Sequence, residues 1–331
     1  MSGVVSAIRE WLSSIADAWN RFWFQPAPPH TLAMIRVLGG AMLFYTHLVW
    51  SFDLDAFLGP DAWISRDAHR AIVGSDYAWS YLWYLESPAA LWTAHLLALA
   101  VFFLLTIGCF TRVVSVLSCL ITLAYCHRLE GALYGLDQVN AMIAMYLMVG
   151  PSGAVYSVDA WWKRRGSSER PVVLPSYGAN IAVRLLQVHL SIVYLFGGIS
   201  KLKGTMWWDG SAVWFAVANY EYQSLDMTWL GAYPWFIAAL THLTVFWETF
   251  YPVLVWPRVT RPIMLGMAVC VHGGIALCLG MPTFGLAMII ANAAFLPPEL
   301  VEKCVASFGG SGARVQTLPP RDSRTALRRS A

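Results

Sequence analysis

Residues 194–210 combine side chains that could do chemistry with an apolar stretch that could enter a membrane. The apolar run is interrupted by Lys201, and the aromatic pair Trp207 and Trp208 follows shortly after it. A lysine at the end of an apolar segment either reaches the membrane interface with its long side chain or keeps its amine for a function. Lys203 fits the interfacial alternative, because a residue two positions further along a helix points to a different face. For Lys201 both alternatives stay open.

Further ionisable residues are predicted at the same membrane depth as Lys201. Depth along each predicted helix follows from a rise of about 1.5 Å per residue. A single intramembrane histidine more often stabilises a structure than takes part in catalysis. However, a charged group in hydrocarbon costs about 2.5–3.5 kcal/mol, so several on one side of a bundle indicate a functional site. The residues expected near the outer face are His47, His95, Glu130, Asp137, His242 and His272.

Proton transfer beside a lipid-accessible pocket is the chemistry that this cluster permits. Removal from water disfavours an ammonium ion, so Lys201 could act as a neutral base toward a phenol-like hydroxyl with a pKa of about 10. Asp137 or Glu130 nearby would instead keep the lysine charged, and the sequence leaves both outcomes open.

Polar residues deeper in the apolar segments are predicted to hold helices together. Arg184 and Gln187 fall in this group, whereas Arg36, near the inner end of its segment, is predicted either to reach the membrane interface or to pair helices. We expect Glu248, in the inner half of a later segment, to pair with Arg184.

Composition predicts an all-α membrane protein. Of the 331 residues, 58% are hydrophobic and 12% are charged, compared with about 25% charged in a typical soluble domain. A bilayer-spanning helix needs about 20 mostly apolar residues. Eight stretches fit, at about 32–52, 88–108, 112–128, 132–151, 178–200, 232–256, 261–280 and 281–298. We divide the chain into an interfacial amphipathic helix (1–30), a membrane domain (31–300) and a disordered basic tail (301–331).

The distribution of basic residues predicts the orientation of this bundle. Most arginines and lysines, including Arg164, Arg165 and the arginines of the tail, would face one side. The positive-inside rule then places both termini in the cytoplasm of a multi-pass protein, which we expect in a bacterial inner membrane. No basic patch suits nucleic acid, and the spacing of the six cysteines predicts no metal site.

Four pieces of sequence, spread over about residues 32–298, carry a resemblance to a known family. The most specific piece is Gly-Ile-Ser-Lys-Leu around Lys201, followed by tryptophan and Asp-Gly. The pieces are 32–36, 133–136, 194–210 and an end region with 248–258, 272–274 and 283–288. In these residues the chain resembles the horizontally transferred transmembrane (HTTM) domain, which is related to the membrane domain of the vitamin K-dependent γ-glutamyl carboxylases.

The resemblance implies a function. In the carboxylases a lysine deprotonates reduced vitamin K, oxygen converts the quinol into a strong base, and a glutamate loses a γ-proton before carbon dioxide adds. It therefore implies that Lys201 and His272 are catalytic in a carboxylase- or epoxidase-like enzyme, a lyase or an oxidoreductase, with reduced vitamin K or another quinol as cofactor. Ser200 and Glu130 stand where the carboxylases have a second lysine and a histidine. The expected cofactor-binding residues are Tyr194, Trp207, Trp208, His242, Asp137 and Glu130.

The short stretch after the last apolar segment predicts that a partner protein takes part. The carboxylases carry a large luminal domain after their membrane helices, whereas only about thirty residues follow the last apolar stretch here. We therefore expect a separate protein to present any macromolecular substrate, besides the lipid bilayer and a quinone-like ligand as partners. The alternative from a different class is a non-catalytic membrane protein, either a maturation or assembly factor or a carrier of a small molecule.

Overall fold

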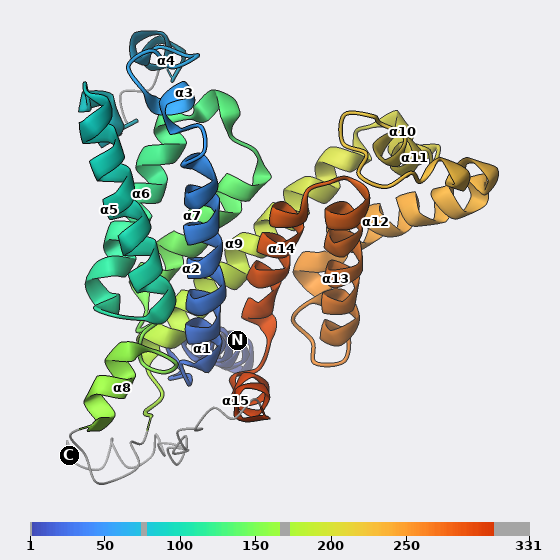
Figure 1. The fold of residues 1–331 in the computed structure, drawn as a ribbon. Coiled ribbons are helices and arrows are strands. Elements are labelled where there is room, and N and C mark those ends of the chain that lie inside the picture. The colour runs from blue at the N-terminus through green and yellow to red at the C-terminus, as the bar shows by residue number, and fades with distance from the viewer. Residues whose placement is uncertain (1, 74–77, 166–172, 308–331) are drawn as a thin grey trace.

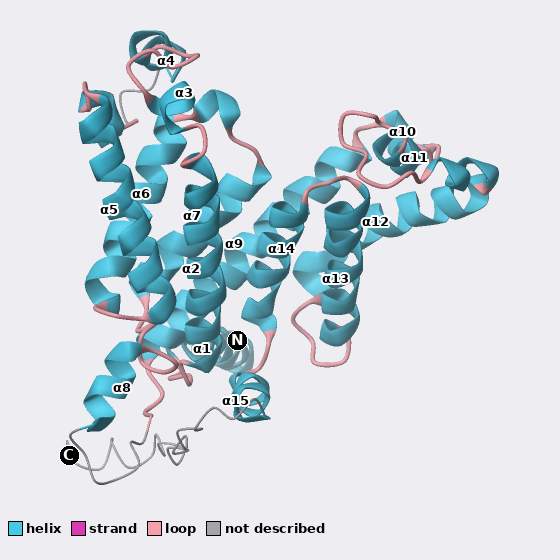
Figure 2. Ribbon diagram, in the orientation of Figure 1, coloured by secondary structure: helices cyan, strands magenta, loops and turns pink. Residues whose placement is uncertain are grey.

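The protein consists of helices joined by loops. The structure, a computed structural model, describes residues 2–73, 78–165 and 173–307. Within these ranges there is no β-strand, and one isolated antiparallel bridge pairs Ala27 with Ser176 (Figure 2). The predicted all-α class is thus confirmed.

Nine of the helices are long enough to determine the architecture. They are α1 (Ser2–Phe24), α2 (His30–Trp50), α5 (Pro88–Ile107), α6 (Thr111–Arg128), α7 (Gly135–Val149), α9 (Tyr177–Leu202), α12 (Pro234–Leu254), α13 (Arg261–Cys278) and α14 (Pro282–Asn292). The shorter α-helices are α3 (Leu54–Leu58), α4 (Arg66–Val73), α8 (Val158–Arg165), α10 (Thr205–Trp208), α11 (Ala212–Val217) and α15 (Pro298–Ser307). Four 3₁₀ turns, η1 (Tyr81–Tyr84), η2 (Glu130–Ala132), η3 (Thr228–Ala232) and η4 (Ala293–Phe295), complete the described elements.

Each of the eight predicted segments contains one long helix, from α2 to α14. Among the described residues, α2, α5, α9 and α13 are long and apolar enough to cross a membrane. A fifth span is possible if α14 with η4 counts together with α15, from which it is bent by 117°. Two helices are shorter than expected. Helix α7 has 15 residues and begins at Gly135, where Asp137 accepts a hydrogen bond from the Tyr134 N–H. Helix α14 has 11 residues, from Pro282 to Asn292, and is followed by the 3₁₀ turn η4.

Helix α9 lies at the centre of the packing. It contacts α7 on one side, where α2, α5, α6 and α7 pack together, and α12 on the other side, where α13 and α14 follow (Figure 1). One continuous cluster of buried apolar side chains joins both groups, from Leu43 and Phe102 to Leu190 and Ala287. The two groups thus share a single core, and α9 carries residues of both.

The ends of the bundle hold different short elements. Helices α1, α8 and α15 lie at one end, and α3, α4, α10 and α11 lie at the opposite end (Figure 1). The Asn180 amide of α9 donates hydrogen bonds to the carbonyl oxygens of Phe22 and Trp23 and so attaches α1 to the bundle. Trp11 and Trp19 of α1 are exposed, and the interfacial role of this helix stays a prediction. The predicted tail begins within α15, which continues to Ser307, and the rest of the tail lies outside the described residues.

Candidate functional site

Lys201 forms an ion pair with a carboxylate from another helix. Its Nζ atom lies 2.6 Å from Oε2 of Glu248. Lys201 lies in the last turn of α9, and Glu248 lies in α12. The side chains are 25% and 11% exposed, respectively, so both charges are largely removed from solvent. Among the described residues this is the one ion pair.

The expected pairing of Glu248 with Arg184 is wrong. The Arg184 guanidinium donates to Gln187 Oε1 at 3.0 Å, on its own helix, and lies 4.5 Å from the centre of the Phe22 ring. The physical reason is the arrangement of α9 and α12, which brings the last turn of α9, rather than its first half, next to Glu248. Arg184 instead helps to hold α1 against α9.

Two glycines allow α9 and α12 to approach closely at this ion pair. A Cβ atom added at Gly198 would lie 2.7 Å from the backbone nitrogen of Thr249, closer than real Cβ contacts. A Cβ atom at Gly197 would lie 3.1 Å from Oε2 of Glu248 and 3.9 Å from Nζ of Lys201. Small residues permit such backbone contact between membrane helices. The glycines before Lys201 therefore create the space that the ion pair occupies.

Aromatic residues after α9 cover the ion pair from one side. The ammonium of Lys201 lies 5.2 Å from the centre of the Trp207 ring, which is within cation–π range. Trp208 is exposed and donates its indole N–H to the Leu202 carbonyl at 2.7 Å. The exposed His242 ring approaches the Trp208 carbonyl with Nε2 at 3.1 Å. Trp207 thus touches the charge directly, while Trp208 and His242 stabilise the turn that holds it.

A buried network of hydrogen-bonded side chains involves the face of α9 that also carries Lys201. The hydroxyl of Tyr194 and Nε2 of His272 are 2.7 Å apart. Asn292 donates its amide to Tyr194 Oη at 2.8 Å, and the Tyr251 hydroxyl donates to Asn292 Oδ1 at 2.6 Å. All four residues are buried. They join α9, α13, α14 and α12 in one polar network.

Two residues of this network, Tyr251 and Asn292, were not among the predicted site residues. Asn292 carried a detectable signal, because an asparagine in an apolar stretch must find partners inside a membrane protein. Tyr194 precedes Lys201 by about two helical turns, a spacing that places both on one face of α9. Tyr194 is in turn hydrogen-bonded to His272. The predicted catalytic residues thus belong to one region of the molecule.

The predicted residues Asp137 and Glu130 have other contacts. Asp137 caps the start of α7, and within the described residues neither carboxylate is paired with Lys201. Glu130 is exposed, and its backbone N–H donates to Nε2 of His69 at 3.2 Å. The structure therefore gives both residues roles in the turn between α6 and α7 rather than at the ion pair.

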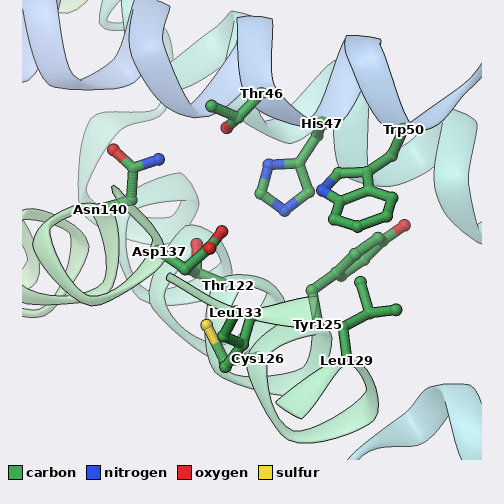
Figure 3. Close-up of a pocket in the computed structure, with 10 residues that line it drawn as sticks. All are labelled: Thr46, His47, Trp50, Thr122, Tyr125, Cys126, Leu129, Leu133, Asp137 and Asn140. Atoms are coloured by element: carbon green, nitrogen blue, oxygen red, sulfur yellow. The ribbon is translucent and has the colours of Figure 1, made fainter. Parts of the chain in front are cut away.

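Asp137 lines a small cavity between α2, α6 and α7 that is separate from the Lys201–Glu248 pair. Its carboxylate and the imidazole of His47 face the same space, next to Asn140 (Figure 3). The cavity volume of about 10 Å³ leaves room for about one water molecule. Nε2 of His47 and Oδ1 of Asn140 have no hydrogen-bond partner in the part of the chain that the structure describes, so a water molecule there would satisfy both atoms.

The last predicted polar residue, His95, has a structural environment. Its Nδ1 lies 2.6 Å from the Tyr125 hydroxyl, and its Nε2 lies 2.8 Å from Oγ of Ser51. The side chain is completely buried. With both ring nitrogens engaged, His95 links α5 to α6 and to the end of α2.

These features define a class of protein: a polytopic helical membrane protein with a partly buried lysine–carboxylate pair between two helices. The family model of the HTTM domain matches residues 24–299. The chain therefore belongs to the HTTM domain family, and it is a multi-pass membrane protein related to the membrane domain of the carboxylases. No curated protein matches the chain, and no solved structure matches it.

Proposed function

We propose that this HTTM protein is a quinol-linked, carboxylase- or epoxidase-like enzyme. In this proposal Lys201 accepts the proton of the quinol, after it has transferred its own proton to Glu248. The observation that carries the proposal is the ion pair itself, with 2.6 Å between Nζ and Oε2 in a largely buried position. A membrane protein rarely retains two ionisable groups at such a place without a functional reason.

The ion pair offers a route for the proton. An ammonium cannot accept a proton, so Lys201 first has to transfer one proton from Nζ to Oε2 of Glu248, which leaves a neutral amine and a neutral acid. The contact between these two atoms is direct. The neutral amine then accepts a proton from a weakly acidic hydroxyl and becomes an ammonium again. At the end Glu248 carries one additional proton, which it must release before the next cycle.

The residues around Lys201 fit an aromatic ligand. Trp207 presents its ring next to the amine, and Tyr194 stacks with Tyr251 with ring centres 4.0 Å apart. We propose that Tyr194, Trp207 and Trp208 hold a quinol such as reduced vitamin K, which would supply the oxidisable hydroxyl. His272 would act through Tyr194, to which it is hydrogen-bonded. His242 would stabilise the turn before Asp209 rather than contact the ligand.

The finer topology belongs to the same proposal. We infer eight membrane spans with both termini in the cytoplasm of a bacterial inner membrane. The placement of α1 and α15 at the same end of the bundle supports an even number of crossings (Figure 1). A reporter fused after Arg165 should be cytoplasmic, and a reporter near Asp209 should be exported. If both reporters were found on the same side of the membrane, the proposed orientation would be wrong.

We also infer that a separate protein presents any macromolecular substrate, and purification with the neighbouring gene products would test this.

The alternative function is a non-catalytic maturation factor or carrier. The observation that favours this alternative is that the ion pair with Glu248 keeps Lys201 charged. The two functions differ in their response to substitution of Lys201.

The deciding experiment compares conservative variants of this lysine. The protein is purified from its own membrane, and bound quinones are identified by mass spectrometry. Lys201→Arg preserves an ion pair with Glu248 but removes the proton transfer, since arginine stays protonated. We expect turnover of the co-purified quinol to be lost in Lys201→Arg and Lys201→Ala, and to persist in the control Lys203→Ala. Wild-type turnover in Lys201→Arg would exclude the enzymatic proposal and leave the non-catalytic alternative.

A further inference from the structure

A second pocket lies at the end of the molecule that holds α3 and α4. It is formed by α3, the loop before α4, α4 itself, the end of α6 and the η2 turn, and it has a volume of about 220 Å³. Its walls are mainly apolar and include Phe57, Trp63 and Ile64. The rings of Phe57 and Trp63 pack against each other with centres 4.8 Å apart. The pocket is therefore large enough for a small organic molecule with an apolar body.

A buried cation that has no counter-ion among the described residues lines this pocket. Arg128 is 1% exposed and donates from Nη2 to the Ile64 carbonyl at 3.1 Å. Its Nε–H has no hydrogen-bond partner, and within the described residues no carboxylate lies within 4.0 Å of it. A guanidinium remains charged in proteins and has five donor hydrogens. Burial of such a group without an anion is unfavourable, so Arg128 is poised to bind one.

A second unpartnered donor lines the same pocket. His69 is 1% exposed, and its Nε2 accepts the backbone N–H of Glu130. In a neutral ring the hydrogen is then on Nδ1, and this atom has no partner. Arg128 and His69 therefore both offer hydrogen-bond donors. None of the eight residues that line the pocket is an aspartate or a glutamate.

We propose that this pocket is a binding site for a small organic anion, in which a carboxylate or phosphate monoester pairs with Arg128 and His69. The planar guanidinium can donate two parallel hydrogen bonds to either kind of anion. The apolar part of the ligand would lie against Phe57, Trp63 and Ile64. The pocket is distinct from the Lys201 site, since α3 and α4 lie well away from α10 and α12 in the bundle (Figure 1). The inference thus goes beyond the proposed proton chemistry and does not depend on it.

The test uses three probes that differ in charge and head group. The full chain is placed in nanodiscs of phosphatidylcholine, and binding is measured by equilibrium dialysis with 3-phenylpropionate, phenyl phosphate and the uncharged 3-phenylpropionamide. We expect at least one anion to bind at least about tenfold more tightly than the amide, because the amide leaves the guanidinium unpaired. Preference for 3-phenylpropionate would identify a free carboxylate as the ligand. Preference for phenyl phosphate, with competition by added phosphatidic acid, whose head group is also a phosphate monoester, would identify a lipid head group.

Two variants test the site without relying on one folding outcome. Arg128→Gln removes the charge and should weaken anion binding at least about tenfold. Gly131→Leu fills the pocket from its wall, where an added Cβ atom would meet only Cδ1 of Ile64 at 3.5 Å, so this variant should fold and lose binding. The matched control is Arg70→Gln on α4, because Arg70 lies over the rings of Trp83 and Tyr84. Equal binding of anion and amide, or unchanged anion binding in Gly131→Leu, would overturn the proposal.

Discussion

Neutralisation of one partner of the Lys201–Glu248 pair should destabilise the protein more than neutralisation of both. At 2.6 Å, two unit charges attract each other by ~6 kcal/mol at an effective dielectric constant of about 20. Desolvation of the two groups offsets much of this attraction. Loss of one partner of a buried pair typically costs about 3–5 kcal/mol, because the other charge remains buried alone. The lysine is 25% exposed, so water will shield it, and we expect a cost of about 2–3 kcal/mol for Glu248→Gln.

The other two variants complete a double-mutant cycle. Lys201→Met should cost less than Glu248→Gln, since the remaining carboxyl group can take up a proton and become neutral. The double variant should lie within about 1 kcal/mol of the wild type. The coupling energy, which is the sum of the two single costs minus the cost of the double variant, should then be at least about 1 kcal/mol.

The free energy of unfolding can be measured by reversible unfolding in mixed micelles with increasing denaturing detergent. Lys203→Met is the control, because this exposed lysine should change stability by no more than about 0.5 kcal/mol. Additive effects of the two single variants, with a coupling below about 0.5 kcal/mol, would show that the ion pair does not contribute to the fold.

Three further outcomes follow from individual contacts. Asp159 accepts the N–H groups of Phe110 and Thr111 at the start of α6, and Asp159→Asn should cost about 1 kcal/mol of unfolding free energy. Burial alone would raise the pKa of Asp159, but these hydrogen bonds outweigh burial and lower the pKa. The stabilisation by Asp159 is therefore present near neutral pH and lost below about pH 4. Measurements of the free energy of unfolding at several pH values will detect this loss. Gly198→Ala should destabilise by about 1–3 kcal/mol through its clash with α12, whereas Gly273→Ala, with nothing within 4 Å of the added Cβ, should be neutral or slightly stabilising in the same assay. Tyr194→Phe should cost about 1–3 kcal/mol, since it removes one of the two acceptors of the Asn292 amide and leaves the Met288 carbonyl as the other, and an unchanged melting temperature would contradict that network.

Much of the architecture could be predicted from the sequence. Apolar segments of about 20 residues allow only helices in a membrane, because every backbone N–H and C=O needs an internal partner there. The all-α class and the family followed from this pattern and from the motif around Lys201. The lengths of α7 and α14 were overestimated, because apolar composition extends into the residues before the Asp137 cap of α7 and into the 3₁₀ turn η4 that follows α14.

Local contacts of the polar residues could also have been read from the sequence, but they were not. Asp137 stands three residues after Tyr134, the spacing of a side chain that caps the start of a helix. This short-range hydrogen bond explains why Asp137 is engaged at the start of α7 rather than with Lys201. A polar residue near a helix end should therefore be tested first as a cap.

By itself, the sequence determined that Lys201 ends an apolar helix and that an aromatic turn follows it. Only the tertiary structure decided which acid meets the lysine. Glu248 is separated from Lys201 by 47 residues, and on sequence grounds Glu248 was expected to pair with Arg184, while Asp137 or Glu130 was expected near Lys201. The choice depends on the direction and close approach of α9 and α12, which small residues such as Gly198 permit through backbone contact. Helical periodicity tells which residues share a face of one helix, but it contains no information about which face of another helix lies opposite.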